Sequence, residues 1–326
     1  MPITYSEYQL EDFEGYCACL DSFYQGTHPC PQYFEREFLE DLIQKHELLI
    51  VLAKHNGKVI GTSAAQLRRG HFENSVLLGM RYIDEAYQGR GIGSKLESYF
   101  MERVYYHFPD ANSYYADVVT QNIACQKTIV RHGFVLTVIY PMLYRLVTYQ
   151  RLYPESVYRM TMVDYVKANK YDLRTIYPPA EYAPIIEKFY QELKVPCHML
   201  TAAPGEEALF DVDELPREGT AEIFVEKAGT DAAALVDAIQ EYLQKKWIIA
   251  LYINMCHPGA DDLCRILQPM GFYFCGIKPL NQGKEYLVLC QTENHLGDLR
   301  NVQILPVYSD FANMVLGGIG QYEKQQ

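Results

Sequence analysis

The stretch Ile83-Asp84-Glu85-Ala86-Tyr87-Gln88-Gly89-Arg90-Gly91-Ile92-Gly93-Ser94-Lys95 places three alternate glycines between two apolar segments. Residues 76–83 before it predict a strand, and apolar residues recur at helical spacing through 92–107. The alternate glycines lack the Cβ atoms that keep a phosphate away from the main chain. The helix N-terminus adds unpaired N–H groups and a partial positive charge. Because Arg90 and Lys95 add full charges at the same end, this stretch predicts a diphosphate cradle.

The cradle differs from the two common nucleotide motifs. A P-loop requires GxxxxGK[ST], which no register of this segment provides. The dinucleotide fingerprint requires a third glycine where this chain has Ser94, and it opens a parallel βαβ unit. Here three strands of antiparallel character come first, which argues against a nucleotide fold. A tight turn that binds no ligand is the remaining alternative.

The segments around the cradle predict a mixed α/β domain. Helical spacing is found at 12–23 and 33–45, and two apolar runs at 48–53 and 59–65 flank Asn56-Gly57, a typical hairpin turn. After the cradle helix, the pattern predicts a strand at 114–120, a helix at 123–132 and a strand at 134–140. The predicted element order up to this point is ααβββαβαβ.

The remainder of the chain predicts a second, smaller α/β unit. We expect strands at 156–166 and 173–177, a helix at 181–193 and a connecting loop at 202–219, followed by strand 221–226, helix 231–245, strand 247–254, helix 261–267 and strands 272–277 and 286–291. Gly133-Phe134 and Gly271-Phe272 each end a helix and open a strand. This shared junction indicates an internal duplication. The alternative is two unrelated units that happen to have the same Gly-Phe junction.

Two motifs resemble those of the GNAT superfamily of N-acetyltransferases. The segment 88–93 resembles that family's Q/R-x-x-G-x-G/A signature, and Asn122 through Gly133-Phe134 resembles its second motif. The resemblance implies an α/β (α+β) fold with a mixed, mostly antiparallel central sheet flanked by helices. It implies a GNAT acyl-CoA-binding domain at 1–150 and a degenerate GNAT-like second domain at 151–326, as in certain bacterial proteins. Because the second half lacks the glycine-rich loop, we expect no second cofactor there.

The resemblance also implies a cofactor, acetyl-CoA, and the residues that hold it. Main-chain groups of the cradle would bind the pyrophosphate: Gln88, Gly89, Arg90, Gly91, Ile92, Gly93 and Ser94. The strand edge around Arg81 and Ile83 would bind the pantetheine arm and the thioester carbonyl. Asn122 would contact the pantetheine or cap the following helix, a common role for asparagine.

Catalysis in this family is direct attack of an amine on the thioester, which implies N-acetyltransfer to a small-molecule or peptide amine. The family position of the tyrosine that protonates the thiolate is Ile129 here, which cannot donate a proton. Tyr140 and Tyr144 are candidate acids, and Glu73 and Asp117 are candidate bases. For each of them a core or surface role is the alternative. A non-catalytic acyl-CoA sensor or regulatory protein is therefore the alternative function.

Charge and length restrict the partners. The 326 residues exceed a typical single domain. Residues 1–150 hold 13 basic and 17 acidic side chains, whereas 151–326 hold 16 and 24, for a net charge of −12. An acidic second half argues against nucleic acid or an anionic membrane as partner. It would suit a cationic amine, and a homodimer is compatible with the sequence.

The cysteines and the N-terminus indicate a compartment. The nine cysteines are an odd number without a CxxC pair, which favours free thiols over a zinc site or a disulfide framework. The first ten residues lack a signal-peptide pattern, and no apolar run approaches the roughly 18 residues of a membrane span. We therefore expect a cytoplasmic location and no metal.

Overall fold

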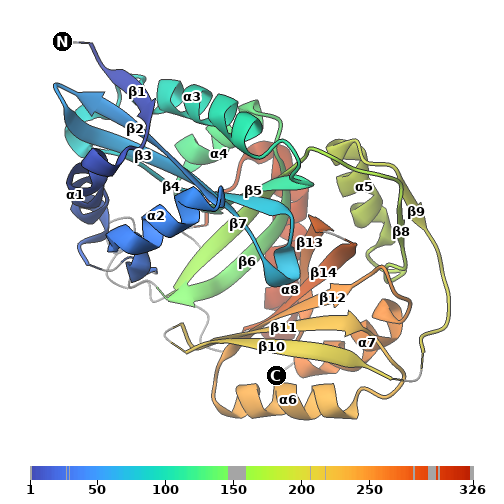
Figure 1. Cartoon of the computed structure of the whole chain (residues 1–326). Coiled ribbons are helices and arrows are strands. Elements are labelled where there is room, and N and C mark those ends of the chain that lie inside the picture. Colours follow the sequence, from blue (N-terminus) through green and yellow to red (C-terminus); the bar gives the residue numbers. More distant parts are fainter. Residues whose placement is uncertain are drawn as a thin grey trace.

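A computed structural model describes residues 2–26, 28, 30–145, 159–205, 207–216, 218–281, 283–292, 299 and 302–323. One twelve-stranded mixed sheet runs through both halves of the chain in the order β1-β2-β3-β4-β5-β7-β6-β13-β14-β12-β11-β10 (Figure 1). Its strands are β1 (Thr4–Glu7), β2 (Leu48–His55), β3 (Lys58–Leu67), β4 (Ser75–Ile83), β5 (Ser113–Val119), β6 (Val135–Arg145), β7 (Arg159–Ala168), β10 (Leu209–Leu215), β11 (Thr220–Lys227), β12 (Ile248–Asn254), β13 (Tyr273–Asn281) and β14 (Lys284–Gln291). A separate parallel pair is formed by β8 (Arg174–Ile176) and β9 (Cys197–Met199).

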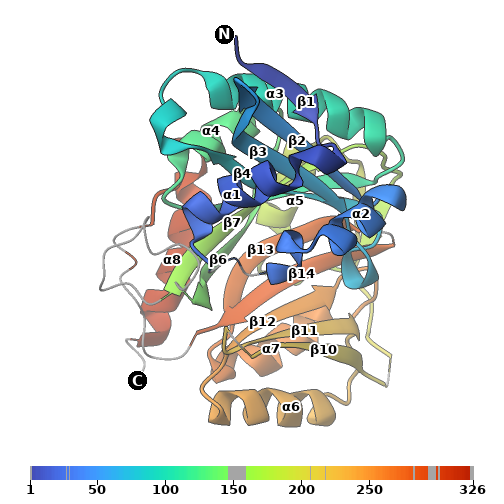
Figure 2. The same cartoon turned by 60° about the vertical axis from the view of Figure 1, so that its left-hand side comes forward.

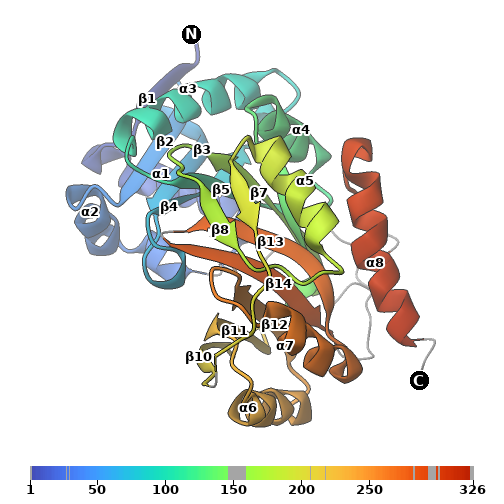
Figure 3. The same cartoon turned by 90° about the vertical axis from the view of Figure 1, so that its right-hand side faces the viewer.

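Helices cover both faces of this sheet. They are α1 (Phe13–Tyr24), α2 (Arg36–Gln44), α3 (Ile92–His107), α4 (Ile123–Arg131), α5 (Ala183–Leu193), α6 (Ala233–Gln244), α7 (Ala260–Leu267) and α8 (Ser309–Glu323). In the described part of the chain, short 3-10 turns lie at Leu10–Asp12, Pro31–Phe34, Gly70–Phe72, Glu85–Tyr87, Gln268–Met270 and Pro306–Tyr308. Figure 3 shows α5 and α8 over the central strands, where α5 contacts β6 and β7 and α8 contacts β13. The α/β fold expected from the sequence is confirmed.

Strand β2 explains why helices pack on both sides of the first half. Its residues alternate between two apolar clusters: Ile50 and Leu52 pack with α1 and α2, whereas Leu49 and Val51 pack with α3. Because successive side chains of a strand point to opposite faces, a strand that is apolar throughout is buried on both. The hairpin to β3 turns at Asn56-Gly57, where both residues are left-handed, as that dipeptide predicts.

The sheet order is symmetric about its middle. From β6 outward the strands are β6, β7, β5, β4 and β3, and from β13 outward they are β13, β14, β12, β11 and β10. The parallel pairs β4–β5 and β11–β12 occupy matching places, and α3 and α6 connect them. The same connectivity in both halves supports the internal duplication that the Gly-Phe junctions predicted. Gly133 and Gly271 both have positive φ after a helical segment, as expected.

The two halves join at β6 and β13, which lie side by side at the centre of Figure 2. The pair Gly276–Val138 connects these strands. Gly276 has φ +129°, and a Cβ there would lie 2.0 Å from the carbonyl oxygen of Thr137. Only glycine fits at this contact. The two sheet halves approach each other this closely because no side chain stands between them.

Some sequence expectations were wrong or incomplete. Residues 202–219 were expected to be a loop but contain β10, whose alternate acidic residues face outward and hide the strand pattern. The short strands β1 and β9 and helix α8 were not expected. The proposed domain boundary at 150 lies outside the described residues and stays a prediction; β7, which follows it, lies between β5 and β6 in the sheet.

Candidate functional site

The parallel strands β4 and β5 separate halfway along their length. They pair only from Ser75–Ser113 to Leu78–Ala116. Beyond that point β4 continues to Ile83 paired with β3, and β5 continues to Val119 paired with β7. The register with β3 shifts in the same region, and Met80 has φ +49°, which marks a bulge that turns β4 away. The result is a wedge-shaped opening in the sheet. Along this opening, the edge of β4 that faces β5 makes no main-chain pairing with it.

The glycine-rich cradle lies directly after the open part of β4. Gly89 and Gly91 have φ +72° and +73°, and a Cβ on either would meet no atom within 4 Å. The first main-chain bond of α3 runs from the Lys95 N–H to the Gly91 carbonyl, at 3.3 Å. The amides of residues 92–94 therefore point out of the helix end, as expected for an anion site. Gln88 closes the loop by donating from Nε2 to the Ile83 carbonyl, at 2.8 Å.

The other predicted cofactor residues lie near this end of α3. Gly93 packs against β4, since a Cβ there would lie 3.6 Å from Ile83 Cγ1. Arg90 and Ser94 are exposed, whereas the Ile92 side chain is buried, so its main chain alone is accessible. Asn122 accepts a hydrogen bond from the Cys125 N–H at 3.0 Å and thus caps α4. Its contact with a cofactor stays a prediction.

The side chain of Arg81 reaches the space between α3 and α4. Its Nη2 lies 3.4 Å from Glu97 Oε1, and its Nη1 lies 3.7 Å from Cys125 Sγ. Both Nε and Nη2 are buried and lack a hydrogen-bond partner among the described residues. Nη2 still has the Glu97 carboxylate as an ion-pair partner, whereas Nε has no acceptor in the described part of the chain, which is unusual for a buried donor in a folded protein. Together with the open space at Gly89 and Gly91, these donors fit a polar ligand that passes from the cradle to the opening.

The matching region of the second half is closed. Strands β11 and β12 stay paired from Thr220–Ile248 to Val225–Ile253. The Thr230 N–H, after β11, donates to the Gly205 carbonyl at 2.9 Å, and a Cβ at Gly229 would lie 2.3 Å from the main chain of Glu207. Main-chain atoms of Gly205, Glu207 and Ala208 therefore fill the place that corresponds to the cradle.

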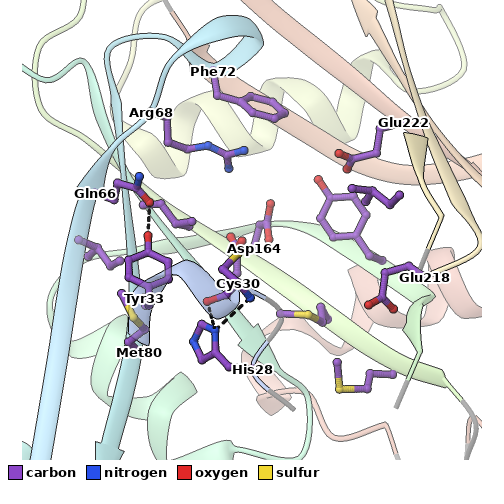
Figure 4. A pocket seen from close by; sticks show the side chains of 18 of the residues that line it. His28, Cys30, Tyr33, Gln66, Arg68, Phe72, Met80, Asp164, Glu218 and Glu222 are labelled. Carbon is purple, nitrogen blue, oxygen red and sulfur yellow. Dashed lines mark hydrogen bonds between the residues drawn. The ribbon is translucent and has the colours of Figure 1, made fainter. Parts of the chain in front are cut away.

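A cavity of about 860 Å³ lies on the opposite face of the opening, between the two halves (Figure 4). Leu78, Gly79 and Met80 of β4 and Asp117 of β5 line it, so it reaches both edges of the wedge. Charged side chains line the rest: Arg68 after β3 and Asp164 on β7 come from one side of the β6–β13 junction, and Glu214, Glu218, Glu222 and Lys278 come from the β10–β14 side. Carboxylates outnumber cations, and methionine, leucine and tyrosine side chains supply apolar walls.

Two carboxylates face each other beside the wedge. Asp117 on β5 is directly opposite Asp164 on β7. Burial and then the charge of Asp117 raise the pKa of Asp164 to about 7, although Lys278 opposes this from 2.7 Å. The Oδ1 atom of Asp117 is buried and has no hydrogen-bond partner among the described residues. Such a pair can take up a proton near neutral pH.

Tyr140 also lines the cavity. Burial raises the pKa of its phenol well above the usual 10, so it stays protonated. Its hydroxyl lies 3.3 Å from that of Tyr252, which lies 2.8 Å from Glu222 Oε1. Because a carboxylate only accepts, the Tyr252 proton points to Glu222, and the Tyr252 oxygen can then accept a hydrogen bond from the Tyr140 hydroxyl.

The other candidates from the sequence are Glu73, Tyr144 and the position of Ile129. Glu73 is exposed before β4 and does not line the cavity. The main chain of Tyr144 pairs with Met160 in the sheet, but its side chain lies outside the described residues. Ile129 is buried in the core, so the family position of the catalytic tyrosine holds an apolar side chain.

The sequence reasoning missed Arg68, Asp164 and Lys278. Asp164 and Lys278 interrupt the apolar central parts of β7 and β13, and a charge in such a run is a signal that could have been used. Arg68 gave no such signal, because it lies beside Arg69 at the end of a strand. In the described part of the chain, no cluster of His, Cys, Asp or Glu could hold a metal ion, and no helix is long and apolar enough to cross a membrane.

Comparison with known proteins gives one match to a family model and similarities to several solved structures. Residues 13–134 match the model of the acetyltransferase (GNAT) family. The chain is similar to an N-acetyltransferase from Staphylococcus aureus Mu50, with 16% identity, a TM-score of 0.43, and 52% of this chain and 100% of the other covered. It is also similar to yncA, a putative acetyltransferase from Salmonella typhimurium with its cofactor acetyl-CoA. Here the identity is 16%, the TM-score is 0.43, and the similarity covers 53% of this chain and 96% of the other. No curated protein matches the sequence significantly.

Proposed function

We propose, because residues 13–134 match the model of the acetyltransferase (GNAT) family, that the chain is an acetyl-CoA-dependent N-acetyltransferase. Its acceptor is an amine bound in the cavity between the two halves. The cradle at Gln88–Ser94 and the donors of Arg81 hold the cofactor, which supplies an activated acetyl thioester.

The observation that carries this proposal is the wedge between β4 and β5, which connects two differently built sites. Arg81 points to the side of α3 and α4, whereas the preceding Met80 lines the cavity on the other face. A ligand that follows the β4 edge from the cradle would thus present its reactive end to the cavity. An acceptor in the cavity would meet it within the wedge, and this proximity is a large part of catalysis in direct transfer.

The chemistry requires a new C–N bond, cleavage of the C–S bond, removal of a proton from the nitrogen and delivery of a proton to the thiolate. Asp117 and Asp164 lie where the amine would enter and accept its proton. Tyr140 lines the same cavity and donates to the thiolate. Main-chain N–H groups on the open edge of β4 stabilise the negative charge that develops on the carbonyl oxygen.

The second candidate is an acyl-CoA sensor without turnover. The buried Ile129 favours it, because the family's usual proton donor is absent. A thiolate leaves readily near neutral pH, however, so that absence alone does not prevent transfer. The expected cytoplasmic location, bacterial origin and homodimer stay predictions.

Titration calorimetry with acetyl-CoA, followed by thiol release over a panel of amines, tests the proposal. We expect saturable binding and thiol release with at least one amine, and a Tyr140→Phe variant that binds acetyl-CoA normally but releases thiol about 100-fold more slowly. Binding without release from any amine would favour the sensor. No binding at all would refute both functions.

A further inference from the structure

Arg68 is a cation in the acceptor cavity without a counter-ion. It follows β3, is half-buried, and its Cζ lies 4.3 Å from the centre of the Phe72 ring (Figure 4). Throughout the part of the chain that the structure describes, no carboxylate lies within ion-pair distance of it. By contrast, the adjacent Arg69 pairs with Glu47 outside the cavity.

Most acidic groups around the cavity already have partners. Lys278 pairs with Asp164, the Tyr252 hydroxyl binds Glu222, and Glu214 accepts from Tyr242 at 2.9 Å. Among the residues that the structure describes, the cavity therefore contains a cation without an ion-pair partner, Arg68, and a buried carboxylate oxygen without a hydrogen bond, Oδ1 of Asp117. A ligand that satisfies both must carry a negative and a positive group.

A second polar group accompanies Arg68. Gln66, two residues earlier on the same edge of the cavity, accepts a hydrogen bond at Oε1 from the Tyr33 hydroxyl. Its amide NH₂ is then oriented by that bond and can donate. A guanidinium stacked on an aromatic ring beside an amide donor is a suitable receptor for a carboxylate, since arginine binds carboxylates through two parallel hydrogen bonds.

We propose that the acceptor is an amino acid with an apolar side chain, whose carboxylate binds Arg68 and Gln66 while its amine lies at the wedge beside Asp117. This inference rests on the proposed acetyltransferase function. The methionine and leucine walls, which include Met80, Met160 and Leu215, accommodate the apolar side chain. The acceptor is thus a zwitterion rather than a simple cationic amine.

The carboxylate contact can be tested without turnover. Calorimetry would measure 3-phenylpropanoate binding to the wild type, to Arg68→Gln and to the matched control Arg69→Gln. We expect wild-type binding to be kept in Arg69→Gln and weakened about 10- to 100-fold in Arg68→Gln, the range of a charge-assisted hydrogen bond. Equal binding by all three proteins, or binding by none, would overturn the inference. Thermal unfolding would verify that both variants are folded.

A second experiment measures substrate preference during turnover. Thiol release would be compared for phenylalanine against phenethylamine and for methionine against 3-(methylthio)propylamine, which lack only the carboxylate. We expect each amino acid to be preferred by the wild type and by Arg69→Gln, and the preference to be lost in Arg68→Gln and reversed in Arg68→Glu. Equal rates for both members of each pair would refute the carboxylate contact while leaving the acetyltransferase intact. If no compound releases thiol but 3-phenylpropanoate binding depends on Arg68, the acetyltransferase proposal fails and the carboxylate site stands.

Discussion

Replacing Gly91 by alanine distinguishes the role of the cradle in cofactor binding from its role in the stability of the fold. Gly91 is the left-handed residue that begins α3, with φ +73°. An alanine in this conformation costs about 1 kcal/mol. Since its Cβ would meet no protein atom within 4 Å, this strain is the main stability cost, and we expect the melting temperature to fall by about 2–4 °C.

The effect on acetyl-CoA binding should be larger. The added methyl group would occupy the open space beside the exposed amides of residues 92–94, where the pyrophosphate is expected. Hydrogen bonds to a charged group contribute about 1.5–3 kcal/mol each, so the loss of one or two weakens binding by roughly 10- to 10,000-fold. Calorimetric titration of the variant with acetyl-CoA measures this loss.

Gly283 offers a matched control. It lies in the turn between β13 and β14 with φ +69°, and a Cβ there also meets nothing within 4 Å. Gly283→Ala should therefore carry the same strain and bind acetyl-CoA like the wild type. If Gly91→Ala keeps full affinity, or if both variants lose affinity equally, the cradle does not bind the pyrophosphate of the cofactor.

Two further predictions concern the buried carboxylates. Because the pKa of Asp164 is raised to about 7, kcat/KM should fall as the pH drops below about 7. Asp117→Asn removes the neighbouring negative charge and should therefore move this fall to lower pH. A pH-rate profile of the variant measures the shift, and a profile identical to that of the wild type would contradict the prediction. Lys278→Met leaves Asp164 buried without its partner and should destabilise the protein by about 3–5 kcal/mol in urea unfolding at pH 8, whereas Lys278→Met combined with Asp164→Asn should recover most of that loss. Equal stability of the single and double variants would show that the ion pair is not the cause.

Local signals in the sequence predicted much of the first half. Helix α3 begins and ends at the predicted residues, because its glycine start and its apolar period agree. The wedge was not predicted, since it depends on the left-handed Met80, a residue without any local preference for that conformation. Strand β10 was missed because its acidic, half-exposed face resembles a loop.

The candidate site divides in the same way. The cradle is continuous in sequence and was found, whereas the acceptor cavity combines residues from β3 to β13 that approach each other only after the sheet has formed. Asp117 was selected by its position on the strand facing β4, but its partner Asp164 lies 47 positions later on β7. No spacing rule connects such residues, so the pair is visible only in three dimensions.

The joined sheet has a consequence for how the acceptor cavity behaves on dilution. Two walls of the cavity come from opposite halves of the chain, an arrangement also found at interfaces between subunits. Here the covalent chain and the contact at Gly276 hold the two walls together. Their effective concentration is fixed by the fold and does not change with the amount of protein in solution. The affinity for the acceptor should therefore be independent of protein concentration, and the second half is free to vary its side chains without any requirement that a partner copy change with it.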